Sequence, residues 1–187
     1  MTTSARRFVH DLTEAHHDFP SAGVLFRDLT PVFASAAAFA AVIDELSDGV
    51  SAPSVGDPAS EPIARVDAIA GVEARGFLLA AATAYKVGAG LLALRKPGKL
   101  PGELLAETFD LEYGSASLEL QPGRLPAGSR VRLLDDVLAT GGTLLAAVRL
   151  LERAGYEVES IAVVVEIDGL GGREVLDGYP VSSITTL

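Results

Sequence analysis

The stretch from Arg130 to Gly155, RVRLLDDVLATGGTLLAAVRLLERAG, constrains the fold of this 187-residue chain more than any other. Val131–Leu134 is a short apolar run, broken only by Arg132, and it predicts a buried parallel strand that stops at the acidic pair. Val137–Thr143 predicts a turn. Apolar residues then recur at helical spacing as far as Gly155, where a glycine can end the helix. The segment therefore predicts a strand, an acidic pair, a glycine–threonine loop and a helix.

The loop of this segment has the chemistry of a phosphate site. Its N–H groups converge with the positive end of the helix dipole just past the strand, and its glycines let the backbone approach a ligand closely. It is not a Walker A loop, because Thr143 follows Gly142 where a lysine is required. Asp135 and Asp136 favour a sugar phosphate, since carboxylates can accept from ribose hydroxyls while the loop holds the 5′-phosphate. The alternative is an aspartate that caps an ordinary helix.

Composition narrows the class of protein. A hydrophobic fraction of 49% and a charged fraction of 21% indicate a globular chain of one domain. The absence of cysteine excludes disulfides and thiolate metal sites. No apolar run has transmembrane length and the N-terminus lacks the apolar core of a signal peptide, so we expect a cytoplasmic location. A net charge of −10 argues against a nucleic-acid surface. It also predicts that a site for a polyanionic substrate gathers the few cations of the chain locally, uses a metal ion, or both.

Two further strands lead into loops with basic residues. Val66–Ala70 precedes GVEARGF and a helix beginning near Phe77, which places Arg75 at the C-terminal edge of the sheet, where ligands bind in open α/β folds. Gly90–Leu94 leads into RKPGKLPGE, the densest basic cluster of the chain. Its prolines and glycines suit a loop that closes over a diphosphate. The alternatives are a surface arginine and a solvated run of charge.

The N-terminal part predicts a helix followed by an irregular apolar cover. Ser4 to about His17 has the spacing of an amphipathic helix that carries all three histidines, which we interpret as surface residues without a shared metal. Phe19–Phe33, FPSAGVLFRDLTPVF, contains prolines and a glycine that argue against regular structure. Such an apolar segment is either a lid over the core or a base pocket with an aromatic face for stacking.

The remaining chain alternates strands and helices, which predicts a mostly parallel α/β sheet with helices on both faces. Gly169–Gly172 is not a dinucleotide loop, because a third glycine at the right spacing is missing. The other expected elements are a helix over Ser35–Val50, an exposed insertion over Ser51–Pro62, a loose ribbon pairing Leu105–Leu111 with Ala116–Leu120, a strand over Glu157–Ile167, a short helix over Arg173–Leu176 and a last strand over Val181–Thr186.

Several motifs resemble one family. LLDDVLATGGT, Leu133–Thr143, is similar to the signature of the type I phosphoribosyltransferases, which bind 5-phosphoribosyl 1-diphosphate. FP-x-x-GV-x-FRD-x-(S/T)-PV resembles the hood of the adenine-specific branch, and GKLPG with LEYG resembles the flexible catalytic loop. The resemblance implies one domain over 1–187, with the hood at about 1–33 and the catalytic loop at about 96–120. It also implies a purine salvage enzyme that transfers the 5-phosphoribosyl group to adenine, giving AMP and diphosphate.

The resemblance assigns roles to individual residues. Glu112 would take the purine proton, with Arg75 and Lys99 as further catalytic residues. Adenine would contact Leu25, Phe26, Arg27 and Ile167, with Phe26 and Ile167 on opposite faces and the backbone of Leu25 and Arg27 at its edge. The ribose and its 5′-phosphate would contact Asp135, Asp136, Ala139, Thr140, Gly141, Gly142 and Thr143. The diphosphate would contact Glu73, Ala74, Arg75, Arg95, Lys96 and Lys99.

Cofactor and partner follow from the same resemblance. Mg²⁺ would arrive with the diphosphate, held mainly by substrate oxygens and water and by no protein group directly. Relatives are commonly homodimers, and Arg95 would reach a neighbouring site. The Glu73–Ala74 peptide is expected to be cis, and Phe109 stands where relatives often carry tyrosine. Two alternatives are a 6-oxopurine transferase and a non-catalytic sensor of the phosphoribosyl ligand. The hood motif argues against the first. The second would require a basic domain or face, which this sequence lacks.

Overall fold

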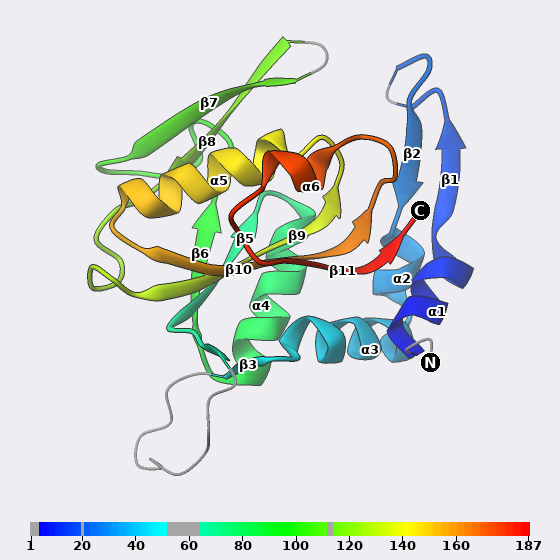
Figure 1. Cartoon of the computed structure of the whole chain (residues 1–187), viewed down its shortest axis with the longest axis horizontal. Helices are drawn as coiled ribbons and strands as arrows, with labels where there is room; N and C mark the ends of the chain where they lie inside the picture. Colours follow the sequence, from blue (N-terminus) through cyan, green and yellow to red (C-terminus); the bar gives the residue numbers. More distant parts are fainter. Residues whose placement is uncertain (1–3, 20, 52–63, 112–113) are drawn as a thin grey trace.

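Five parallel strands form the central sheet of the computed structural model, in the order β11-β10-β9-β5-β6 (Figure 1). The structure describes residues 4–19, 21–51, 64–111 and 114–187. The strands are β5 Ala68–Val72, β6 Gly90–Leu94, β9 Arg130–Leu138, β10 Glu157–Glu166 and β11 Val181–Thr186. The predicted parallel α/β sheet is confirmed, and β6 and β11 have the predicted bounds.

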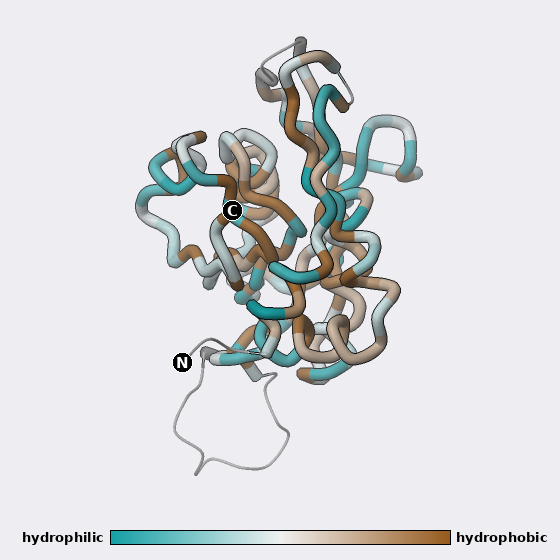
Figure 2. The backbone as a smooth tube through the Cα atoms, turned by 90° about the vertical axis from the view of Figure 1, so that its right-hand side faces the viewer, coloured by the Kyte–Doolittle hydropathy of each residue, from teal (hydrophilic) through white to brown (hydrophobic). Residues whose placement is uncertain are grey.

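Helices cover both faces of this sheet. The helix α5, Gly142–Arg153, packs on one face, while α3, Ala36–Ser47, and α4, Arg75–Val87, pack on the other (Figure 1). Neighbouring side chains of a strand point to opposite faces, so Leu133 joins the core under α5 and Leu134 the core over α3 and α4. Burying one such leucine stabilises the fold by about 1.5–3 kcal/mol. The hydropathy of the backbone follows this arrangement, with hydrophobic colour along the strands and hydrophilic colour at many turns (Figure 2).

The prediction that β9 stops before Asp135 and Asp136 is wrong. β10 stays paired with β9 as far as Leu138, which lies opposite Glu166, so the carboxylates belong to the last part of the strand. The predicted turn shrinks to Ala139–Gly141, between β9 and α5. Continuous pairing with a neighbouring strand holds the acidic pair in a rigid position.

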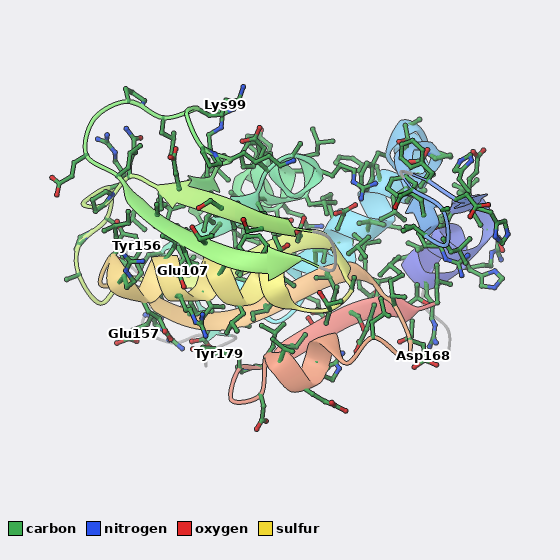
Figure 3. The ribbon with its side chains drawn as sticks, turned by 90° about the horizontal axis from the view of Figure 1, so that it is seen from above. Lys99, Glu107, Tyr156, Glu157, Asp168 and Tyr179 are labelled. Atoms are coloured by element: carbon green, nitrogen blue, oxygen red, sulfur yellow. The ribbon has the colours of Figure 1, made fainter. Side chains whose placement is uncertain are left out.

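An antiparallel ribbon lies over α5, formed by β7, Leu105–Leu111, and β8, Gly114–Leu120. The predicted pairing is confirmed, but the ribbon is not loose at its base. The Glu107 carboxylate lies 3.4 Å from Arg149 and 2.9 Å from Arg153, both on α5 (Figure 3). These ion pairs and the shared core fix the ribbon to the helix that follows the predicted phosphate loop.

The hood is built differently from the prediction. Its elements are α1 Ser4–Leu12, β1 Glu14–His17, β2 Leu25–Asp28 and α2 Thr30–Ala34. A helix continuing to His17 is wrong, because α1 ends at Leu12 and Glu14–His17 form the strand β1. These residues pair with β2, with His16 opposite Phe26.

The segment from Phe19 to Phe33 also contains regular structure, contrary to the prediction. β2 forms because β1 supplies its hydrogen-bonding partner. Pro31 lies in the first turn of α2, where a missing N–H removes no helical bond. Pro31 therefore marks the start of a helix here.

The other elements differ from the prediction only by shifts of one to three residues at their ends. Ser51 ends the short strand β3, Val50–Ser51, which pairs with β4, Ala64–Arg65, while residues 52–62 of the predicted insertion lie outside the described residues. α6 spans Gly172–Val175. In the part of the chain that is described, no helix has the length and apolar character needed to cross a membrane.

Candidate active site

The acidic pair lies at the carboxyl end of β9. Asp136 is only 5% exposed, and its backbone N–H donates to Asp135 Oδ1 at 2.9 Å. Burial, together with the charge of Asp136, raises the pKa of Asp135 well above the usual aspartate value. Burial also raises the pKa of Asp136, although the nearby Arg75 charge opposes this effect. Two buried carboxylates this close attract any group that brings positive charge or hydroxyl donors.

The predicted phosphate loop lies directly beyond this pair. Gly141 is the N-cap of α5 and has no side chain to occupy the free N–H groups of the first turn. A small pocket of about 80 Å³ follows the loop, lined by Asp135, Val137, Leu138, Ala139, Thr140, Gly141, Gly142, Thr143 and Leu144. The structure therefore brings the predicted phosphate residues together at the positive end of a helix, as an anion site requires.

Arg75 connects three parts of the predicted site. It is the first residue of α4, and its Nε lies 2.7 Å from Asp136 Oδ2. Its guanidinium also lies over the ring of Phe26, with 5.2 Å between the guanidinium carbon and the ring centroid. Arg75 thus touches both the acidic pair and the hood, and the sequence did not predict these contacts. The peptide between Glu73 and Ala74 is cis, as expected.

Glu73 holds the basic loop after β6. Its carboxylate accepts from the Lys96 backbone N–H at 2.9 Å and from Arg95 Nε at 3.3 Å. The hydrogen bond from Lys96 lowers the pKa of Glu73, so the side chain stays ionised. Arg95 also donates to the Lys99 carbonyl at 3.2 Å, whereas the Lys99 side chain points away from the body of the molecule (Figure 3). The structure thus gives Glu73 and Arg95 a role in shaping the loop.

These groups surround one cleft of about 880 Å³. It is lined by Val72, Glu73, Ala74, Arg75, Lys96, Pro97, Thr108, Phe109, Ser115, Ala116, Ser117, Leu118, Asp135, Asp136 and Thr143. Its walls come from the end of β9, the loop before α4, the basic loop and the ribbon. The hydroxyls of Thr108, Ser115 and Ser117 were not predicted as site residues. Polar residues alternate along this ribbon, and that pattern could have indicated a polar face. The sequence does not show which part of the molecule the ribbon packs against.

The predicted adenine residues lie in two places. Phe26 and Leu25 are on β2, and Phe26 packs edge-on against Phe19 with ring centroids 5.1 Å apart. Ile167 follows β10 and lines a separate cavity of about 720 Å³ together with Glu166 and residues of α6. This cavity and the cleft at Asp135 share no lining residue among those described. The clamp of Phe26 and Ile167 around adenine therefore stays a prediction.

Two carboxylates that the sequence did not predict lie beside His16. Because β1 is a strand, His16 lies on the same side as Glu14, and Glu14 is paired with Asp28 of β2. One ligand atom from each of these three residues lies within 4.8 Å of the others at the surface of the hood. Glu112 and Tyr113 lie outside the described residues, so the predicted proton acceptor has no position here.

Comparison with known proteins agrees with this geometry. The model of the phosphoribosyl transferase domain family matches residues 57–186. The adenine phosphoribosyltransferase of Clavibacter michiganensis subsp. michiganensis is 60% identical over 185 residues, covering 99% of this chain and 98% of that protein. The crystal structure of the adenine phosphoribosyltransferase from Thermoanaerobacter pseudethanolicus gives a TM-score of 0.86 at 39% identity, covering 97% of this chain and 99% of its own. The Giardia lamblia APRTase complexed with 9-deazaadenine gives 0.84 at 37% identity, covering 99% of both chains.

A parallel sheet whose carboxyl edge carries an acidic pair, a helix-start anion loop and an arginine defines an enzyme of phosphoribosyl transfer, and the chain belongs to the phosphoribosyltransferase family. Within that family it is one of the adenine phosphoribosyltransferases. The predicted fold class and family are confirmed.

Proposed function

We propose that the cleft at the end of β9 is where this enzyme transfers the 5-phosphoribosyl group of 5-phosphoribosyl 1-diphosphate to adenine, giving AMP and diphosphate. One observation carries the proposal: Arg75, the buried acidic pair and the start of α5 line the same cleft. They match, in order, a diphosphate, two ribose hydroxyls and a 5′-phosphate. Diphosphate release measured with adenine, hypoxanthine, guanine, xanthine and orotate tests it, and we expect turnover with adenine alone.

Charge separation is the difficult part of the reaction, and the site residues suit it. Departure of diphosphate leaves positive charge on the ribose ring, so preorganised charges contribute most of the catalysis. Burial destabilises the charged forms of Asp135 and Asp136, and their raised pKa values reflect this cost in free energy. A cationic ribose beside them offsets that cost in the transition state. Arg75, Lys96 and Lys99 would bind the leaving diphosphate.

The ribose contact has a free acceptor. Asp136 Oδ2 makes no hydrogen bond to any described residue, although it lies 2.7 Å from Arg75 Nε. A ribose hydroxyl can donate to this oxygen once the guanidinium turns toward the diphosphate. Ala139–Thr143 would at the same time bind the 5′-phosphate through backbone N–H groups and the threonine hydroxyls.

The hood is the proposed source of base specificity. Phe26 offers an aromatic face, and the backbone of Leu25 and Arg27 can donate to and accept from the edge of adenine. Ile167 would cover the other face. Recognition by backbone groups suits an exocyclic amine, whereas a 6-oxopurine would require a donor to its oxygen.

Glu112 is the proposed acceptor of the purine proton. Transfer to the anomeric carbon leaves a proton on the ring, and a carboxylate brought in by the catalytic loop can take it. Glu112→Gln should lower kcat by about 100-fold, the usual size of one general-base contribution, with little change in KM. Steady-state kinetics across pH measures this, and a retained rate would assign the proton to another group. Phe109 lines the cleft, but its side chain has no hydroxyl that could take over the role of Glu112.

Mg²⁺ is the proposed cofactor. Among the described residues that line the cleft, the carboxyl groups belong to Glu73, Asp135 and Asp136, and oxygen ligands of this kind suit a hard cation. Mg²⁺ keeps several waters, so we expect it mainly on substrate oxygens, with these carboxylates reached through water. When bound, it would neutralise charge on the diphosphate. Removal of Mg²⁺ with a chelator should abolish turnover while leaving the melting temperature of the ligand-free protein unchanged.

A homodimer is proposed from the exposed side of α4 and the edge of the sheet. Leu78 and Tyr85 lie two helical turns apart and are 53% and 91% exposed. Leu91 on the edge strand β6 is 52% exposed. Apolar side chains grouped in this way favour a protein interface. Light scattering should give the mass of a dimer for the native chain and of a monomer for Tyr85→Glu.

We also propose that the chain works as one domain in the cytoplasm. Val9 of α1 lies in the same core as α3 and α4, so the hood is part of the body of the enzyme. The sequence contains no cysteine, and its fold needs no oxidising compartment. Fractionation of cells that express the chain should place it with cytoplasmic markers.

A further inference from the structure

The short helix α6 packs against the phosphate loop with no space for a side chain between them. Gly172, its first residue, is buried, and a Cβ atom there would lie 2.1 Å from the Ala139 carbonyl oxygen and 2.7 Å from Leu138 Cδ1. The φ angle of Gly172 lies outside the left-handed region. The position therefore needs glycine because of its close neighbours, above all the Ala139 carbonyl, and not because of its own φ angle.

The contact is equally tight from the side of the loop. A Cβ atom on Gly141 would lie 2.7 Å from the Gly172 carbonyl oxygen and 3.1 Å from Val175 Cβ. Gly141 also has a φ of +84°, which favours glycine for a second reason. Two backbones thus meet directly, and neither can move toward the other. Rigid contacts of this kind transmit displacement, since packed protein interiors compress little.

Arg173 anchors α6 to the sheet on its other side. Its Nε donates to Glu166 Oε1 at 3.0 Å, and its guanidinium donates to the Val181 carbonyl at 2.7 Å. Ser183 of β11 donates to the same Glu166 carboxylate at 3.0 Å. Glu166 ends β10 and Val181 begins β11, so α6 is held by the two strands that carry the adjacent edge of the sheet.

We propose that α6 is a support for the 5′-phosphate loop, with Gly172 as the positioning residue. Gly172 sets the place of Ala139–Gly141, and Arg173 with Glu166 keeps α6 against the loop. This role rests on the proposed binding of the 5′-phosphate by that loop. It also gives a purpose to the pattern GLGGREV, residues 169–175, which is not a dinucleotide motif.

Gly172→Ala tests the proposal in the full-length enzyme. The added methyl group must push α6 and the loop apart, so the dissociation constant of AMP should rise by about tenfold or more, while that of adenine stays unchanged. The KM for 5-phosphoribosyl 1-diphosphate should rise with it, and the KM for adenine should not. Calorimetric titration with AMP and with adenine, each against the native chain, gives the two constants.

Two further variants keep the test decisive. Glu174→Ala removes an exposed side chain from the same helix and should leave both dissociation constants unchanged. Arg173→Ala removes the hydrogen bonds that anchor α6 and adds no atom between α6 and the loop. It should weaken AMP binding by a few-fold and leave adenine binding unchanged. If Gly172→Ala does not fold, Arg173→Ala carries the test, because its side chain is exposed.

Equal weakening of AMP and adenine, or no weakening of either, in the folded variant would overturn the proposal. If α6 has only a structural role, Gly172→Ala should lower the melting temperature and leave the ratio of the AMP and adenine dissociation constants unchanged. Thr143→Val separates this failure from failure of the loop assignment. If Thr143→Val weakens AMP binding and Gly172→Ala does not, only the role of α6 is wrong. If Thr143→Val has no effect, the loop does not bind the phosphate and the role of α6 falls with it.

Discussion

The proposed phosphate cradle and the hood, which is the proposed adenine site, are built in opposite ways. The cradle, Asp135–Thr143, lies at the end of a strand that is paired on both sides and buried between two cores. The hood strands β1 and β2 form a separate two-stranded sheet with exposed and half-buried residues. The cradle must hold buried charge in a fixed place, whereas the hood needs only an aromatic face and backbone groups. Precise charge placement requires a rigid interior, and recognition of a flat base does not.

The most severe test removes the charge of the cradle. Asp135→Asn together with Asp136→Asn should lower kcat/KM by about 1000-fold, because the ribose cation loses both of its counter-charges. The fold should persist, since asparagine has the same shape and no burial penalty for charge. Steady-state kinetics and circular dichroism measure the two effects. Unchanged kinetics would remove ribose recognition from the role of these residues.

A smaller loss is expected at the phosphate loop. Thr143→Val keeps the shape of the side chain and removes its hydroxyl donor. The change should reduce kcat/KM by about 100-fold, corresponding to roughly 2.7 kcal/mol for one preorganised anion contact. A neutral result for Thr143→Val contradicts the anchor.

The hood should respond more weakly and more selectively. Phe26→Leu should raise the KM for adenine by about tenfold, the size of one lost stacking contact, and leave the KM for 5-phosphoribosyl 1-diphosphate unchanged. Phe19→Leu is the control, because Phe19 touches Phe26 but is 54% exposed. If both KM values rise together for Phe26→Leu, its contact with Arg75 makes the hood part of the cradle and the comparison fails.

The smallest predicted effect concerns stability and its dependence on pH. The pKa of Asp135 is raised in the folded protein, so burying its charged form lowers the free energy of unfolding. This loss is complete at pH values above the raised pKa, and it is absent at pH values where the group is protonated in both the folded and the unfolded chain. Asp135→Asn should therefore melt a few degrees higher than the native chain at pH 8, at about 2–4 °C per kcal/mol. The difference should shrink as pH falls and vanish toward the ordinary aspartate value of about 3.9. Thermal unfolding at several pH values measures it, and a difference independent of pH argues against a charge effect.

The sequence predicted the order of elements in the cradle well because its parts are contiguous. One strand, two carboxylates, a glycine loop and a helix follow each other along the chain, so local pattern and helix-end chemistry were sufficient. The end of β9 was wrong, because its length depends on pairing with β10, and α5 begins earlier than the predicted turn allowed. The predicted order of parallel strands followed from the same local signals.

Contacts between distant segments could not be predicted in this way. β1 was taken for helix because its pairing with β2 has no signal in its own residues. The approach of Arg75 to Asp136, and of Glu107 to Arg149, depends on how loops and ribbon dock. Gly172 was noted only as part of a failed motif, since close contact with Ala139 is visible only in three dimensions.

The position of β9 has a consequence for how this enzyme can change over generations. Leu133 and Leu134 belong to different cores, and the strand that carries them ends in the acidic pair. A substitution in either core that shifts β9 moves the carboxylates as well, so selection for activity also constrains residues far from the substrate. We expect substitutions in β1 and β2 to be tolerated more readily, because these strands carry no part of those cores. Directed evolution toward other purine bases should therefore accumulate its changes in β1 and β2 while β9 stays constant.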